Sequence, residues 1–160
     1  MINLKKMKNN LEILIGHLNE DHKNVLRWFN NNKNNLVEKW PHDESLNMLL
    51  ATKAKGIYKP KNLKYAVSVR SGLKQNYEDI LNQKNDGSFK FKYFQENSDI
   101  RKRDLEYTNR AITQNINDVV PLGVIIQLKP KPYSQYKILG LGIVKGWEKG
   151  HFLIQSLNAE

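Results

Sequence analysis

Hydrophobic positions in the first third of the chain follow a helical period. Apolar side chains in residues 11–18 recur at spacings of three and four, which predicts an amphipathic helix. A second apolar stripe runs through residues 25–29 and continues over residues 36–40. The Asn-rich run at 30–35 lies between them. It predicts a turn or a frayed helix end, because Asn side chains compete for backbone hydrogen bonds.

A third helix is expected before the pattern changes. Proline disfavours the helical conformation in the residue before it, so Trp40 and Pro41 predict the end of a helix. Ser45 is a candidate N-cap for the next helix, which carries leucines within residues 46–50. Residues 1–55 are therefore predicted to form an N-terminal helical segment.

From Gly56 onward the pattern is typical of strands. Short runs rich in β-branched and aromatic residues alternate with turn signals such as Asp86-Gly87. The expected strands are residues 57–58, 65–69, 89–93, 119–128, 136–144 and 151–154. One helix is expected over 104–117. Several short strands around one main helix indicate an α+β domain over residues 56–160, with a curved sheet or partial barrel.

Composition narrows the class of protein. The 160 residues are 39% hydrophobic and 26% charged, as in one globular domain. No apolar run approaches the ~20 residues that span a bilayer, so no membrane association is expected. The chain has no cysteine, which excludes disulfides and thiolate metal sites and fits a cytoplasmic location.

The net charge of +10 favours a polyanionic partner. Residues 1–55 carry nine Lys and Arg against six Asp and Glu, whereas residues 56–160 carry seventeen against ten. Most of the excess therefore lies in the β-rich part, which is the better candidate for contacting phosphates.

Three motifs follow one another in that part. They are Tyr77-Glu78-Asp79, then Gly87-Ser88-Phe89 running to Tyr93, then Asn109-Arg110-Ala111-Ile112. In this order they resemble the SRA (SET- and RING-associated, PUA-related) domains, above all the modified-cytosine sensors of bacterial modification-dependent restriction endonucleases. The resemblance extends to a Gly-Ile-Tyr-Lys-Pro strand at 56–60 and a Val-Pro-Leu-Gly segment at 120–123, and covers about residues 56–155.

The resemblance implies a pocket for a flipped base. Tyr77 and Tyr93 would sandwich the base, and Asp79 would read its edge. The strand is one residue longer than in the family, so either Phe91 or Tyr93 would face the pocket. Aromatic faces and a carboxylate that accepts the cytosine amine offset the cost of extruding the base.

Basic side chains around these motifs are the candidates for contacts with the DNA backbone. They are Arg70, Lys74, Lys90, Lys92, Arg101, Lys102 and Arg103. In the family a Gly-rich basic loop follows the strand. Here residues 95–103 lack glycine but end in three consecutive cations.

Structural roles compete with these assignments. Both tyrosines fit a β-sheet core, and Asp79 fits a turn cap equally well. Asn109 is favoured as a structural residue that satisfies backbone groups. His17 and His22 are five residues apart, not the four that would place two ligands on one helical face, so no metal site is expected.

The predicted function is that of a reader of 5-methyl- or 5-hydroxymethylcytosine in double-stranded DNA. It would act by base flipping as the sensor of a restriction system. No catalytic set and no cofactor are expected in this chain; a nuclease would lie in another domain or subunit, and a homo-oligomer is compatible. The alternatives are a PUA-like reader of modified RNA or methylated adenine, and a small metal-dependent nuclease.

Overall fold

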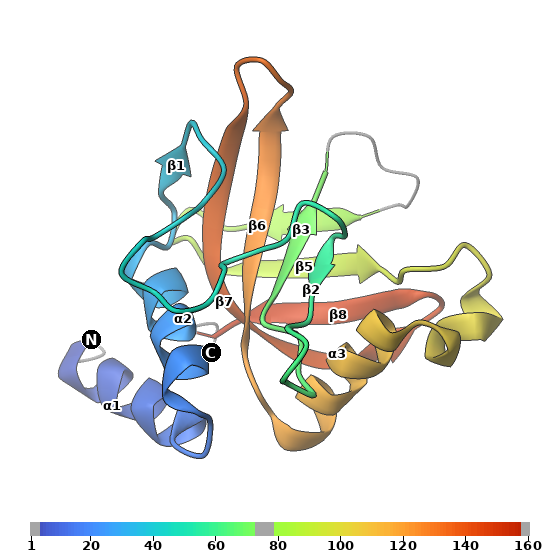
Figure 1. Ribbon diagram of the computed structural model, residues 1–160, viewed down its shortest axis with the longest axis horizontal. Helices are drawn as coiled ribbons and strands as arrows, with labels where there is room; N and C mark the ends of the chain where they lie inside the picture. The colour runs from blue at the N-terminus through green and yellow to red at the C-terminus, as the bar shows by residue number, and fades with distance from the viewer. Residues whose placement is uncertain (1–3, 73–78, 158–160) are drawn as a thin grey trace.

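The computed structural model describes residues 4–72 and 79–157. Eight strands within these ranges form one curved sheet that does not close, in the order β2-β3-β6-β7-β8-β5-β4, with β1 pairing with β7 (Figure 1). The strands are β1 (Leu36–Val37), β2 (Ile57–Tyr58), β3 (Ser68–Ser71), β4 (Ile80–Gln83), β5 (Phe89–Phe94), β6 (Leu122–Lys129), β7 (Gln135–Glu148) and β8 (His151–Ser156). The predicted α+β class with a curved sheet is confirmed.

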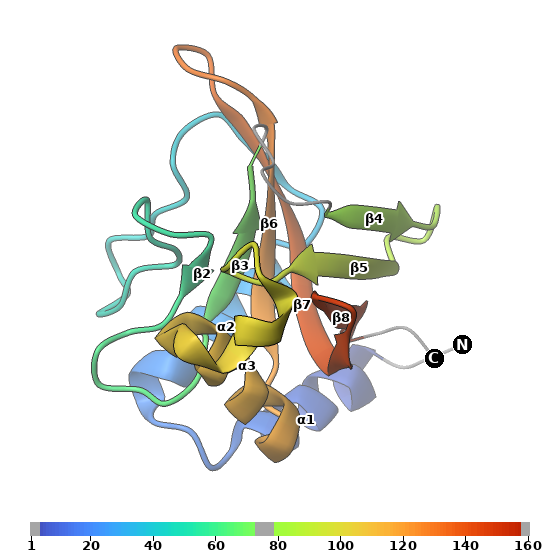
Figure 2. The same ribbon diagram turned by 90° about the vertical axis from the view of Figure 1, so that its right-hand side faces the viewer.

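The helices lie toward one end of the sheet, and the β6–β7 hairpin projects from the other end (Figures 1 and 2). They are α1 (Leu4–Ile15), α2 (Glu20–Asn31), α3 (Tyr107–Asp118) and the 3-10 helix η1 (Ile100–Leu105). In the described part of the chain, no helix has the length and apolar character needed to cross a bilayer.

Helix α2 joins the N-terminal segment to the sheet. Asn19 caps it by accepting a hydrogen bond from the His22 backbone N–H at 2.8 Å. Its apolar side buries Val25, Leu26 and Phe29, and the Phe29 ring packs against Gly123 of β6. The N-terminal segment and the sheet thus share one hydrophobic cluster. The division at residue 55 remains a prediction about domains.

Strand β5 has the alternation expected from its sequence. Phe89, Phe91 and Tyr93 are buried, and the intervening lysines are exposed. The buried side chains join a second cluster with residues of α3 and the facing strands. This cluster fills the concave side of the sheet.

Two helical predictions for the N-terminal segment are wrong. Residues 41–55 contain no helix, because Asp43 accepts hydrogen bonds from both the backbone N–H and the hydroxyl of Ser45 and fixes a tight turn instead. The apolar stripe of α2 does not continue over 36–40: Leu36 and Val37 form strand β1 against Lys137 and Tyr136.

Other predictions differ from the structure at the element boundaries. The helix expected over 104–117 begins at Tyr107, because residues 100–105 form η1. Val119 ends α3 in a left-handed conformation with φ of 53°, so β6 starts three residues after the predicted position. Strand β3 likewise begins at Ser68, not at residue 65. Strand β4 was not predicted.

His22 makes the stability of the fold sensitive to pH. Its side chain is buried, its Nε2 atom has no hydrogen-bond partner in the described ranges, and burial lowers its pKa to about 4. In the unfolded chain His22 binds a proton as the pH falls through about 6.5, whereas in the folded chain its side chain stays neutral until about pH 4. The stabilisation present above pH 6.5 is lost as the pH falls to 4.

We expect the free energy of unfolding to fall by roughly 2 to 3 kcal/mol between pH 6.5 and pH 4 through His22. Urea unfolding at half-unit pH steps measures this slope. In His22→Leu the profile should be flatter over the same interval. An equally steep profile in His22→Leu would contradict the assignment.

Candidate nucleic-acid interface

Asp79 lies where β3, β4 and β5 meet. One carboxylate oxygen accepts a hydrogen bond from the Phe94 backbone N–H, and the other accepts one from the Ser71 hydroxyl, both at 2.8 Å. Burial raises the pKa of Asp79, while these two hydrogen bonds act in the opposite direction. The carboxylate is therefore fixed in orientation and half-buried, and each oxygen keeps a second lone pair.

Two of the predicted pocket aromatics lie on one side of β5. Phe91 and Tyr93 are two residues apart, so both face the concave side, with ring centroids 6.1 Å apart and an interplanar angle of 46°. The Tyr93 side chain is 5% exposed and Phe91 is 2% exposed. Both side chains are therefore members of the second hydrophobic cluster, and Tyr93 directly precedes Phe94, whose backbone N–H binds Asp79.

Gly56 leaves room for the Tyr93 hydroxyl. A Cβ atom at Gly56 would overlap that hydroxyl and would lie 3.1 Å from the Arg70 carbonyl oxygen. The Gly56 carbonyl accepts a hydrogen bond from the Arg70 N–H at 2.7 Å. This glycine therefore lets β3 and the end of β5 approach each other beside Asp79, which suits its place at the start of the Gly-Ile-Tyr-Lys-Pro segment.

The other pocket candidate, Tyr77, lies outside the described residues, as does the backbone candidate Lys74. The placement of Asp79, Phe91 and Tyr93 is known, whereas their convergence with Tyr77 remains a prediction.

Phe94 and His151 were missed by the sequence analysis. Their rings lie edge to face with centroids 5.1 Å apart, and they are paired across β5 and β8. Strand alternation places Phe94 on the side opposite Tyr93, and its backbone N–H orients Asp79. The alternation of β5 was a signal for the side that Phe94 faces, but its pairing with His151 depends on the β5–β8 register.

The predicted backbone cations occupy three separate places. Lys90 and Lys92 are exposed on the outer side of β5. Arg70 lies on β3 beside Trp40, with its guanidinium carbon 5.1 Å from the ring centroid. The third group, residues 101–103, belongs to η1.

The cations of η1 are partly neutralised locally. Arg101 pairs with Asp99 at 3.1 Å and Arg103 pairs with Asp104 at 2.8 Å, while Lys102 is exposed. Hydrogen bonds from these arginines lower the pKa of both carboxyl groups. These exposed pairs are weak, so both arginines can exchange their acid for a phosphate at small cost.

Hydrogen bonds of Gln95 shape the loop after β5. Its buried side chain donates hydrogen bonds to the carbonyl oxygens of Asn97 and Asp99, and its own oxygen accepts one from the Trp147 indole at 2.9 Å. Arg103 lies 5.2 Å from the Trp147 ring centroid. The hydrogen bond between Gln95 and Trp147 therefore connects the loop to β7, and the bonds within the loop fix the backbone that carries its cations.

Asn109 is structural, as favoured. It is fully buried, its amide donates to the Glu96 carbonyl at 2.6 Å, and its side-chain oxygen accepts from the Glu96 N–H at 2.9 Å. The Glu96 carboxylate accepts hydrogen bonds from the Ile57 N–H and the Thr108 hydroxyl. These bonds join β2, the loop after β5 and the start of α3, and so fix the positions of these three segments relative to one another.

Within the described ranges, no cluster of three or more His, Cys, Asp or Glu side chains is placed to hold a metal ion. The chemistry that these residues support is recognition: an oriented carboxylate, buried aromatic rings close to it, and cations on the surrounding surface.

No protein-family model matches the sequence, and no curated protein matches it. Several solved structures, in contrast, are similar to this chain in fold. A crystal structure of the SUVH5 SRA domain with fully methylated CG DNA is similar over 76% of this chain and 88% of that one, with a TM-score of 0.52 and 21% identity. A second crystal form of that complex gives a TM-score of 0.50 over 78% and 90% of the two chains, also at 21% identity. The chain therefore has an SRA-like fold.

Proposed function

We propose that this protein binds double-stranded DNA and reads a modified cytosine that it flips into a pocket formed by Tyr77, Asp79 and Tyr93. The reader would be the sensor of a restriction system, with nuclease activity in another domain or subunit. Asp79 carries the proposal: it is a half-buried, doubly oriented carboxylate in a fold similar to that of a domain crystallised with methylated DNA.

The geometry of Asp79 suits the edge of cytosine. The exocyclic amine of cytosine is a donor, and a carboxylate is an acceptor-only group. Because the Ser71 and Phe94 donors hold the carboxylate in place, little conformational entropy is lost when a base binds. Partial burial strengthens the new hydrogen bond, since water competes with it less.

Stacking would supply the remaining stabilisation. Unstacking and unpairing a base costs a few kcal/mol, and each aromatic–base stack returns roughly 1–3 kcal/mol. Tyr93 is held by the close approach at Gly56, and its ring lies beside Phe91. We propose Tyr93 as the stacking partner from β5, with the Phe91 ring packed beside it.

Exposed cations on β5 and η1 would bind the phosphates of the duplex backbone. Lys90 and Lys92 lie on the outer side of β5, and the other cations belong to η1; both elements follow Asp79 in the sequence. Phosphate contacts position a protein without specifying sequence, so they would act on modified and unmodified DNA alike.

Binding of matched duplexes tests the proposal. We expect one of the 5-methyl- and 5-hydroxymethylcytosine duplexes to bind about tenfold more tightly than the unmodified duplex, because a 5-substituent buried in the pocket adds roughly 1–3 kcal/mol that an unmodified cytosine lacks. Fluorescence anisotropy at three salt concentrations gives the ratio. A glucosylated duplex probes the size of the pocket.

Two further measurements make the test specific. A 2-aminopurine placed next to the modified base should brighten on binding if that base leaves the stack. Equal affinities for all duplexes at every salt concentration would overturn the reader proposal. Cleavage of a modified plasmid by the pure protein with Mg²⁺ or Mn²⁺ would replace it with the nuclease alternative.

A further inference from the structure

A second basic site lies on the other side of β3 from Asp79. Side chains alternate along a strand, so Arg70 points away from the side that Ser71 faces. There it lines a cleft of about 550 Å³ whose walls come from the N-terminal segment, β3 and the β6–β7 hairpin. Its charged and aromatic lining comprises Glu38, Lys39, Trp40, Lys53, Arg70 and Lys131.

Trp40 holds two of the cations in place. The Lys53 ammonium lies 5.6 Å from its ring centroid, and the Arg70 guanidinium lies 5.1 Å from it. Tyr136 packs edge to face against the same ring, with centroids 5.5 Å apart. Cation–π contacts of this kind fix the position of a charge without neutralising it.

Over the described ranges, no acidic side chain pairs with these cations. Within residues 4–72 and 79–157, none of Lys39, Lys53, Arg70 and Lys131 forms an ion pair. The Arg70 Nε–H is buried and has no hydrogen-bond acceptor among the residues that the structure describes. The guanidinium, which lines the cleft, therefore keeps a charge that no acid neutralises within the described ranges, and a phosphate in the cleft would complement that charge. Four cations face one acid, Glu38, so the lining is positive.

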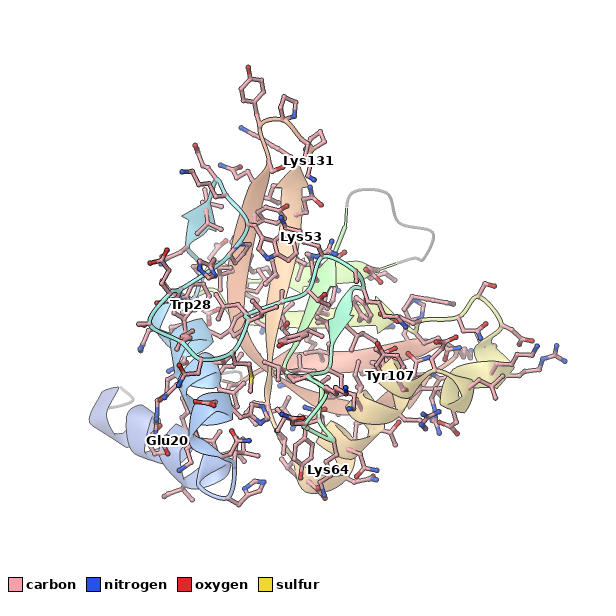
Figure 3. All side chains as sticks on the ribbon, in the orientation of Figure 1. Glu20, Trp28, Lys53, Lys64, Tyr107 and Lys131 are labelled. Atoms are coloured by element: carbon pink, nitrogen blue, oxygen red, sulfur yellow. The ribbon has the colours of Figure 1, made fainter. Side chains whose placement is uncertain are left out.

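The cleft opens at the end of the molecule that carries the hairpin. Figure 3 shows Lys53 and Lys131 at this end and Lys64 at the opposite one. Arg70 directly precedes Ser71, whose hydroxyl orients Asp79. One strand therefore presents the cleft on one side and the carboxylate on the other.

We propose that this cleft binds the phosphodiester backbone of the DNA duplex, and that the N-terminal segment is thereby part of the DNA interface. That the bound stretch flanks the modified base rests on the proposed function. The binding of backbone does not, because phosphate contacts are independent of base identity.

Removal of two exposed cleft cations tests the inference. In Lys53→Gln/Lys131→Gln, we expect the slope of log Kd against log salt to fall by about 1.8, since each lost phosphate contact removes about 0.9. Affinity for unmodified and modified duplexes should weaken by the same factor. Binding of both duplexes is measured by anisotropy from 50 to 300 mM salt.

Lys23→Gln/Lys64→Gln is the matched control. It removes the same charge from surface ion pairs with Glu20 and Asp118, at the opposite end of the molecule, so the salt slope should stay at the wild-type value. Thermal melts confirm that both double variants fold.

The outcomes separate the two proposals. An unchanged slope in the cleft variant overturns the cleft inference, even where a modified duplex remains preferred. A reduced slope with equal affinity for all duplexes supports the cleft and overturns the reader. Failure of the wild-type protein to bind either duplex overturns both.

Discussion

Asp79→Ala should lower affinity for the preferred modified duplex by about tenfold, to that of the unmodified duplex, because a hydrogen bond to a charged group contributes roughly 1.5–3 kcal/mol and binding to phosphates alone sets the lower limit. Affinity for the unmodified duplex should change little, since phosphate contacts dominate there. The ratio of the two Kd values is therefore the measurement, and it should approach one.

Asp79→Asn separates the recognition role from the structural one. An asparagine can accept from the Phe94 N–H through its oxygen and donate to the Ser71 hydroxyl through its amide, which preserves both local hydrogen bonds. We expect wild-type thermal stability and a smaller loss of affinity, about threefold, because the asparagine keeps the local hydrogen bonds but lacks the negative charge. A wild-type affinity ratio in both variants would show that Asp79 only caps its turn.

Low pH should weaken the same interaction between Asp79 and the modified base. Because burial raises the pKa of Asp79, the carboxylate becomes protonated at a higher pH than an exposed aspartate. Selective binding should weaken as the pH falls toward that pKa, and the Asp79→Asn variant should lack this component.

Gly123→Ala should destabilise the fold by about 3 kcal/mol or more, at or beyond the upper end of the usual cost of overpacking. The added methyl group would lie 2.5 Å from both Cδ atoms of Phe29, a fully buried ring, and β6 is fixed by strands on both sides. Since neither can move easily, α2 should be displaced from the sheet. Chemical denaturation measures the change in the free energy of unfolding.

Gly146→Ala is the control in the same sheet. A Cβ at Gly146 has nothing within 4 Å, so this variant should unfold like the wild type. Gly123→Ala/Phe29→Leu should recover part of the loss, because a smaller side chain leaves room for the methyl group. Wild-type stability in Gly123→Ala would mean that α2 docks loosely.

Periodic segments of the sequence predicted their own structure well. The alternation of residues 89–94 and the stripe of residues 25–29 each repeat over enough positions to define the side that is buried. Strand β4 has no such pattern. It exists because Ile80–Gln83 pairs with Lys92–Phe89 of β5, which is a tertiary contact.

The candidate site was predictable only in part. The motif that contains Asp79 is local, so sequence could single it out. Its partners Ser71 and Phe94 lie on two other strands, and their contact with Asp79 depends on a sheet order that runs from β2 to β4 through five other strands. From the sequence, Trp40 served only to predict the end of a helix. It lines the basic cleft because three distant segments meet there.

The parallel pairing of β3 with β6 has a consequence for synthesis of the chain. Ser68 aligns with Gly123, and β6 in turn needs β7, so the ribosome must deliver residues 122–148 before α2 gains its binding surface. Until then no part of β6 or β7 covers Leu26 and Phe29. Such late, long-range closure slows folding and favours aggregation at high temperature, so we recommend cold, slow expression of the entire chain.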